Sequence, residues 1–234
     1  MPSLTLICGP SGAGKTTLER LLQDQGMRRL CSTTTRPPRP GEENGVHYNF
    51  VERDEFEAGL HSQAFIESTH YNGNYYGLTH ADVESSLNGG RPVVAVLDIN
   101  GVLPLFDLYA NVHGVTVQGV FLDADRDELI RRMDNRADMS PELMQQRMAL
   151  IDRDKGWKKH FIPTSQTPEN IRLWSAQNIT MEEMLLLSQT LVRDAIARGA
   201  ENRHDALSAL HEKQHAHEMK VAQATHRRQG MSIM

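Results

Sequence analysis

Two stretches near the N-terminus combine residue types that can hold phosphate groups. The first places glycines, hydroxyls and a lysine in Gly9-Pro10-Ser11-Gly12-Ala13-Gly14-Lys15-Thr16-Thr17. Its glycines let the backbone curl so that N–H groups face a phosphate, Lys15 adds positive charge, and the Thr16 hydroxyl can hold Mg²⁺. We predict that this loop binds the phosphates of a nucleotide, with Lys15 at the reacting phosphate. The loop alone specifies neither base nor reaction.

The second stretch, Ser32 to Phe50, packs two arginines, a glutamate, a tyrosine and hydroxyls into a segment braced by Pro and Gly. An arginine fork matches phosphate oxygens in bidentate pairs, so Arg36 and Arg39 can hold a second phosphate. Glu42 would steady the two arginines. The alternative is a solvated loop in which the arginines pair with acidic neighbours. Because the two stretches lie close in the chain, we predict that two phosphorylated groups meet between them.

Strand-like and helix-like segments alternate along the chain around these stretches. Apolar runs indicate buried strands, and apolar residues at helical spacing indicate helices. Alternation of this kind predicts an α/β fold, a parallel sheet flanked by helices with ligands at the carboxyl ends of the strands. The predicted strands are 3–8, 30–35, 92–99, 115–122 and 171–176, and the predicted helices are 15–25, 101–110, 126–136, 141–159 and a last one from about 180.

Two motifs carry a resemblance to a known family. The tract Ser32-Thr-Thr-Thr-Arg36-x-Pro-Arg39-x-Gly41-Glu42-x-x-Gly45-x-x-Tyr48-x-Phe50, followed by Phe65-Ile-Glu67 and Gly73-Asn-Tyr75-Tyr76-Gly77, resembles the guanylate kinase signature. The resemblance implies a P-loop kinase that transfers the γ-phosphoryl group of Mg·ATP to GMP or dGMP, with the first loop as the ATP site and Mg²⁺ as cofactor. It also implies that the GMP phosphate is held by Ser32, Arg36, Arg39, Tyr48 and Tyr76, and that Glu67 accepts hydrogen bonds from guanine.

The resemblance extends to the metal shell and to a mobile lid. Asp98 ends a predicted strand, where it can serve the acceptor or a metal near the loop, or be a plain strand-end residue. Tracts 127–136 and 141–148 resemble the two sides of the family's lid. This implies that Arg132 reaches ATP and that Arg136 and Arg147 are catalytic at the transferring phosphoryl group. The alternative is that these arginines lie on the wet faces of helices.

Several positions depart from the family pattern. Leu78 stands where a Ser or Thr helps to read guanine, Asn100 replaces an aspartate at the strand end, and Ala137 replaces a glycine in the lid. Base recognition is therefore less specified than phosphate binding. A kinase of another nucleoside monophosphate is the alternative enzyme. A non-catalytic interaction module of the same fold is a further alternative, which the complete phosphate loop disfavours.

Composition limits the partners. The net charge is −5, so the chain has no general basic field for nucleic acid, and small anionic nucleotides are the expected partners. No apolar run approaches the roughly 20 residues that span a bilayer, and the chain starts directly in a strand and loop without room for a signal peptide. We expect no membrane partner and a cytoplasmic location.

The length of 234 residues suggests one main domain and an extension. We assign residues 1–200 to a guanylate kinase-like domain, with a core of 1–35 and 89–200, an acceptor-binding insert of 36–88 and a lid at about 134–146. Residues 201–234 form a predicted helical extension. Its histidines lack a partner carboxylate or second motif for a metal site, so a solvated helix or one that forms a homo-oligomer is expected.

Overall fold

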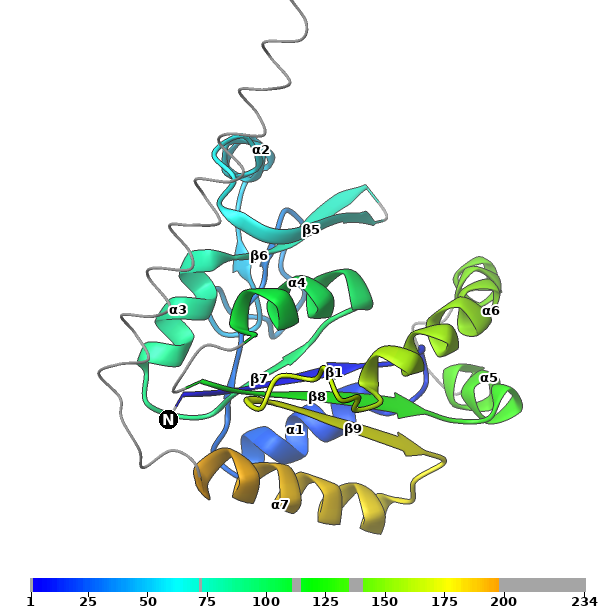
Figure 1. Cartoon of the computed structure of the whole chain (residues 1–234). Coiled ribbons are helices and arrows are strands. Elements are labelled where there is room, and N and C mark those ends of the chain that lie inside the picture. The colour runs from blue at the N-terminus through cyan, green and yellow to red at the C-terminus, as the bar shows by residue number, and fades with distance from the viewer. Residues whose placement is uncertain (1, 72, 111–114, 135–140, 198–234) are drawn as a thin grey trace, which may run out of the picture.

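The computed structural model describes residues 2–71, 73–110, 115–134 and 141–197. Its centre is a five-stranded parallel sheet of order β2-β7-β1-β8-β9 (Figure 1). The predicted α/β fold with a parallel sheet between helices is confirmed. The strands are β1 (Ser3–Cys8), β2 (Arg28–Arg29), β7 (Val93–Val96), β8 (Thr116–Asp123) and β9 (Ile171–Gln177).

Helices cover both faces of this sheet. Helices α1 (Lys15–Asp24) and α7 (Met181–Ala197) lie on one face, and α4 (Ile99–Tyr109) lies on the other with the 3-10 helix η1 (Gly156–Phe161) (Figure 1). Successive side chains of a strand point to opposite faces, so Leu6 enters the core under α4 and Ile7 enters the core under α1 and α7. The carboxyl ends of β1, β7 and β8 are therefore held in place by packing on both faces of the sheet.

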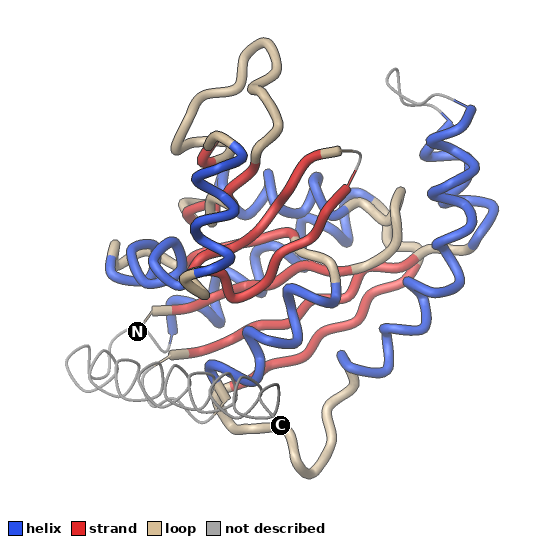
Figure 2. The backbone as a smooth tube through the Cα atoms, turned by 90° about the horizontal axis from the view of Figure 1, so that it is seen from above, coloured by secondary structure: helices blue, strands red, loops and turns tan. Residues whose placement is uncertain are grey.

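A second, four-stranded sheet of order β4-β3-β6-β5 stands beside the first. Figure 2 shows the strands from above with helices along their flanks. Its strands are β3 (Thr33–Thr34), β4 (Asn49–Phe50), β5 (Phe65–Tyr71) and β6 (Asn74–Thr79), and its helices are α2 (Arg53–His61) and α3 (His80–Asn88).

The single strand predicted for residues 30–35 is wrong. Arg28 and Arg29 pair with β7 in the central sheet, whereas Thr33 and Thr34 pair with β4 and β6 in the second sheet. The chain therefore passes from one sheet to the other between these pairs. A run of β-branched threonines favours a strand without specifying its partner, so the sequence does not reveal this change of sheet.

The start of α3 fixes the second sheet. Thr79 and Asp82 form a capping box, in which the Thr79 hydroxyl accepts from Asp82 N and the Asp82 carboxylate accepts from Thr79 N. The same carboxylate accepts from Asn49 Nδ2 at 2.9 Å and from the Thr33 hydroxyl at 3.4 Å. One side chain thus ties α3 to the short strands β3 and β4.

Helices α5 (Arg126–Asp134) and α6 (Pro141–Lys155) project from the carboxyl end of β8 (Figure 1). Lys155 donates to Ala124 O at 2.7 Å and lies 3.1 Å from the Asp123 carboxylate. The base of α6 is therefore attached to the end of β8. The helix predicted for 141–159 ends at Lys155 and continues as the 3-10 helix, and the strand predicted to reach 99 ends at Val96.

The described residues contain no helix that is long and apolar enough to cross a membrane. The predicted extension at 201–234 and the lid centre at 135–140 lie outside the described residues. The predicted domain boundaries stay predictions.

Gly119 in β8 tests the packing between the sheet and α4. A Cβ added there would lie 2.4 Å from Phe106 Cζ and 3.0 Å from Leu173 Cδ2. The Phe106 ring already packs against the Phe161 ring, with 5.8 Å between the ring centroids. We expect Gly119→Ala to lower the free energy of unfolding by about 1–3 kcal/mol in urea denaturation. The control is Gly156→Ala, where an added Cβ meets nothing within 4 Å. Equal stability of both variants would contradict this packing.

Candidate active site

The phosphate loop connects β1 to α1 and packs tightly against β8. A Cβ added to Gly9 would lie 2.0 Å from Leu122 O, and Gly9 has a φ of +140°, so no other residue fits without moving the loop. Gly14, with a φ of 97°, is the N-cap of α1. The loop is therefore fixed where β1 ends, and it leads directly into the N-terminus of α1, the kind of helix end that can bind an anion.

Lys15 and Thr16 lie at the start of α1, as the sequence predicts. Lys15 Nζ donates to Gly9 O at 2.8 Å and to Pro10 O at 2.9 Å, so its ammonium group lies over the loop. Thr16 is exposed in the first helical turn. Asp98 is exposed at the N-cap of α4, where it accepts from Gly101 N at 3.1 Å. An exposed hydroxyl at Thr16 and the Asp98 carboxylate are oxygen ligands of the kind that Mg²⁺ takes, so the residues fit that ion.

Part of the predicted acceptor set comes together around Arg36. The Arg36 guanidinium donates to both oxygens of Glu42 at 2.8 and 2.9 Å, and Glu42 also accepts from Arg39 N at 2.7 Å. These hydrogen bonds, first of all those from Arg36, lower the pKa of Glu42 to about 2. The carboxylate thus stays ionised and fixes the arginine in one orientation.

Two tyrosines complete this cluster. The Arg36 guanidinium lies 5.4 Å from the Tyr48 ring centroid, and the Tyr48 and Tyr76 rings meet edge to face at 6.2 Å. Tyr76 also interacts with Arg36, which contributes to the raised pKa of the arginine. The structure therefore brings Arg36, Glu42, Tyr48 and Tyr76 into one cluster. Arg39 is exposed at its margin, and Ser32 is half-buried where its carbonyl accepts from Asn49 N at 2.8 Å.

An ion pair that the motifs do not indicate supports this cluster. Arg29 Nε donates to Glu19 at 3.2 Å, and the Arg29 guanidinium lies 5.6 Å from the Tyr48 ring centroid. Glu19 belongs to α1 and is buried. The pair therefore connects the helix behind the phosphate loop to the second phosphate cluster. The sequence signal for this pair is Glu19, a charged residue among the apolar positions of α1.

Glu67 lies against the first turn of α4. A Cβ on Gly101 would be 3.3 Å from Glu67 Cγ, which places the carboxyl close to Asp98. Burial, and to a lesser extent the Asp98 charge, raises the pKa of Glu67 to about 7. Its carboxyl is therefore divided between the neutral and ionised forms near neutral pH.

Leu78 has a different role from that expected for its position. The motif predicts a residue beside the base at this position, but the Leu78 side chain is 0 % exposed and packs with Val83, Leu87 and Val102 in the core. Its replacement of a hydroxyl residue therefore serves packing. Asn100 is exposed and donates weakly to Asp98 at 3.4 Å, so it stays beside the site.

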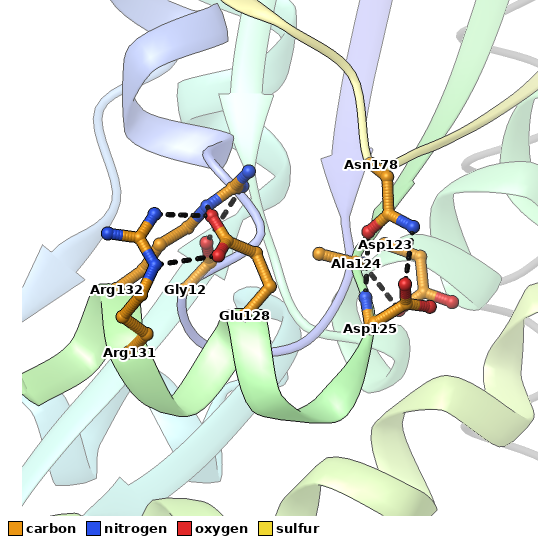
Figure 3. A network of polar contacts seen from close by, with 8 residues as sticks. All are labelled: Gly12, Asp123, Ala124, Asp125, Glu128, Arg131, Arg132 and Asn178. Atoms are coloured by element: carbon orange, nitrogen blue, oxygen red, sulfur yellow. Dashed lines mark hydrogen bonds and ion pairs between the residues drawn. The ribbon is translucent and has the colours of Figure 1, made fainter.

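Arg132 of α5 lies beside the Gly9–Lys15 loop in a polar network (Figure 3). Its guanidinium donates to Glu128 at 2.6 Å and, at 3.5 Å, to Gly12 O. Arg131 donates to the same carboxylate at 2.7 Å, and the hydrogen bonds from these two arginines lower the pKa of Glu128 to about 2. Arg147 is half-buried on α6, and Arg136 lies outside the described residues.

The end of β9 is joined to the same region. Asp125 N donates to Asn178 Oδ1 at 2.8 Å, and Asn178 Nδ2 donates back to the Asp125 carboxylate at 2.8 Å (Figure 3). Asn178 has a positive φ of 53°, a conformation that asparagine tolerates better than most residues. This reciprocal pair holds the end of β9 beside the base of α5.

A cavity of about 140 Å³ lies between the phosphate loop and the start of α4. It lies directly beside Gly9 of the loop and Asp98 at the N-cap of α4. Its lining consists of Cys8, Gly9, Asp98, Ile99, Asn100, Arg153, Asp154 and Trp157.

A family model described as guanylate kinase matches residues 1–161. The chain belongs to the guanylate kinase family. Residues 162–197, which include β9 and α7, lie beyond that match.

Relatives within the guanylate kinase family support this placement. A guanylate kinase of Alkalilimnicola ehrlichii is 38% identical over 149 residues, covering 63% of this chain and 71% of the relative. One of Methylobacillus flagellatus is 39% identical over 149 residues, covering 63% and 72%. A crystal structure of guanylate kinase from Anaplasma phagocytophilum has a TM-score of 0.57 at 20% identity, covering 82% of this chain and 85% of that one, and shows the shared fold.

The raised pKa of Glu67 predicts a pH-dependent stability. As pH rises from 4.5 to about 7, the unfolded chain releases the Glu67 proton while the folded protein keeps it, so the free energy of unfolding falls. Relative to Glu67→Gln, we expect wild type to lose on the order of 3 kcal/mol across this window in urea denaturation. Glu55→Gln, a change on the exposed face of α2, is the control and should follow wild type. Parallel pH profiles of wild type and Glu67→Gln would contradict the burial of this carboxyl.

Proposed function

We propose that this protein transfers the γ-phosphoryl group of Mg·ATP to GMP or dGMP, giving ADP and GDP or dGDP. The observation that carries the proposal is the pairing of two phosphate sites, one in the loop with Lys15 and one in the cluster of Arg36, Glu42, Tyr48 and Tyr76. Family membership supports the same reaction.

On the donor side, the loop N–H groups and Lys15 would hold the phosphates of ATP, and Arg132 would reach them from the base of the lid. Thr16 and Asp98 would hold Mg²⁺, which neutralises phosphate charge when it is bound. Arg136 and Arg147 of the lid are proposed to act on the transferring phosphoryl group.

On the acceptor side, Arg36, Arg39, Ser32, Tyr48 and Tyr76 would hold the attacking phosphate in line with ATP. A phosphate monoester is already largely ionised near neutral pH because its second pKa is about 6, so the reaction needs no general base. Catalysis would then come from alignment and charge neutralisation. The Arg36–Glu42 pair supports this, because it fixes the arginine before the substrate arrives.

Glu67 is proposed to accept hydrogen bonds from the N1–H and N2–H donors of guanine. The alternative is a kinase of another nucleoside monophosphate, and Asn100 motivates it, because an amide replaces a carboxylate that would accept from the guanine amino group. Leu78 does not distinguish the two, because its side chain lies in the core.

The proposal implies nucleotides as the partners and the cytoplasm, where ATP and GMP are found, as the location. Homo-oligomer formation through the C-terminal helices stays a prediction, because residues 198–234 lie outside the described part of the chain.

The proposed reaction is tested by supplying Mg·ATP with GMP, dGMP, AMP, CMP, UMP and dTMP and measuring ADP release. We expect GMP or dGMP to have the highest kcat/KM. Lys15→Ala should fold normally and lose activity on the order of 10²- to 10³-fold, because it removes a charge from the reacting phosphate. A wild-type preference for a non-guanine acceptor would favour the alternative kinase. Activity of Lys15→Ala near that of wild type would refute the role of the loop lysine.

Guanine binding by Glu67 predicts a pH-dependent affinity. Guanine donors require the ionised carboxylate, so binding lowers the Glu67 pKa from its value of about 7 in the free protein, and affinity should rise with pH. We expect GMP affinity to improve about tenfold more in wild type than in Glu67→Gln between pH 6 and 8, measured by calorimetry. The variant also corrects for titration of the GMP phosphate. Profiles with the same slope would exclude Glu67 from the base site.

A further inference from the structure

Arg153 of α6 is the cation among the residues that line the cavity. The cavity has Gly9 of the phosphate loop on one side and Asp98 and Asn100 at the start of α4 on the other. We propose that Arg153 binds the phosphoryl group while it passes between ATP and the acceptor. This inference rests on the proposed phosphotransfer and adds one residue to it.

The present partner of Arg153 can be displaced. Its Nε and Nη2 both donate to a single oxygen of the neighbouring Asp154, at 3.0 and 2.8 Å. The Arg153 side chain is 60% exposed and that of Asp154 is 24% exposed. An exposed ion pair of this kind contributes little to stability, so a phosphate can replace the carboxylate. Within the described residues, no acceptor bonds to Nη1, so a phosphate can engage the guanidinium through that edge.

The position of Arg153 on α6 is fixed relative to the phosphate loop. Lys155, two residues later, donates to Ala124 O at 2.7 Å and lies 3.1 Å from Asp123 at the end of β8. Because β8 also packs against Gly9, the base of α6 and the loop share one rigid support. Arg147 lies about two helical turns farther from this support. Arg153 is therefore placed at the cavity without movement of the lid.

The surroundings of Arg153 suit a phosphoryl group in transfer. Trp157, which also lines the cavity, is partly buried against the apolar core. The other lining side chains include Asp98, Asn100 and Asp154, so the cavity is polar and Arg153 supplies the positive charge among its lining residues. Arg153 would then add positive charge to a cavity that Gly9 of the phosphate loop also lines, so a phosphoryl group held by the loop would meet this charge there.

The test compares Arg153→Met and Arg153→Lys with a matched control, Arg126→Met. Arg126 is also a partly exposed arginine that pairs with a carboxylate of α6, Asp152 at 2.9 Å, but it does not line the cavity. With Mg·ATP and the best acceptor of the wild type, we expect Arg153→Met to lower kcat about 100-fold with little change in either KM. Arg153→Lys should lose less activity than Arg153→Met, because it keeps the positive charge. Arg126→Met should keep a kcat within twofold of wild type.

A binding measurement separates contact with the phosphoryl group from a structural effect. The probe is adenosine joined to guanosine through five phosphates, which occupies both nucleotide sites and the space between them. Arg153→Met should bind this probe at least tenfold more weakly than wild type while binding ATP alone equally well. Unfolding in urea should show equal stability for wild type and all three variants.

The outcomes distinguish this inference from the proposed function. A wild type that phosphorylates no nucleoside monophosphate overturns both. An active wild type with an Arg153→Met variant that keeps its kcat and its affinity for the probe overturns the role of Arg153 alone. Equal losses in Arg153→Met and Arg126→Met would also overturn it, because the effect would then not be specific to the cavity.

Discussion

The site depends on the close approach of the phosphate loop to the backbone of β8. An added Cβ at Gly9 would lie only 2.0 Å from Leu122 O, so the first turn of the loop has a single place to lie. The same strand anchors α6 through Lys155 and continues into α5. The loop, both lid helices and the end of β9 therefore share one support. Any change that moves β8 moves the whole donor side together.

The acceptor side has a different kind of order, which comes from charge and hydrogen bonds. Strands β3 and β4 each have two residues, too few to be stable by pairing alone. Asp82 holds them through Asn49 and Thr33, and Glu42 holds Arg36. Arginine rotamers that are fixed before binding lose less entropy when a phosphate arrives. The polar contacts thus replace the packing that a larger sheet would supply.

The sequence predicted those features that local pattern determines and missed those that depend on the path of the chain. The loop, the alternation of strands and helices, and the grouping of Arg36, Tyr48 and Tyr76 follow from motif and periodicity. The strand at 30–35 was wrong because threonines give strand propensity without a partner. Leu78 was misplaced because residues two apart on a strand share a face, which predicts Leu78 beside Tyr76, whereas at this end of β6 the side chain packs with Val83 and Val102 in the core. Arg29 and Arg153 were missed because only the folded chain brings them to the site.

The pKa of Glu67 shows whether burial or the nearby helix N-terminus has the larger effect on its carboxyl. It lies against the first turn of α4, and a helix N-terminus stabilises a carboxylate by about 0.3–1 kcal/mol. Its pKa is nevertheless raised to about 7, a shift that corresponds to about 3 kcal/mol against the ionised form. Burial and the nearby Asp98 charge therefore outweigh the helix, so near neutral pH part of this carboxyl is protonated and accepts hydrogen bonds less well. Hydrogen bonds to the ionised form favour that form, so a ligand that supplies two N–H donors to this carboxyl would lower its pKa and offset part of the effect of burial.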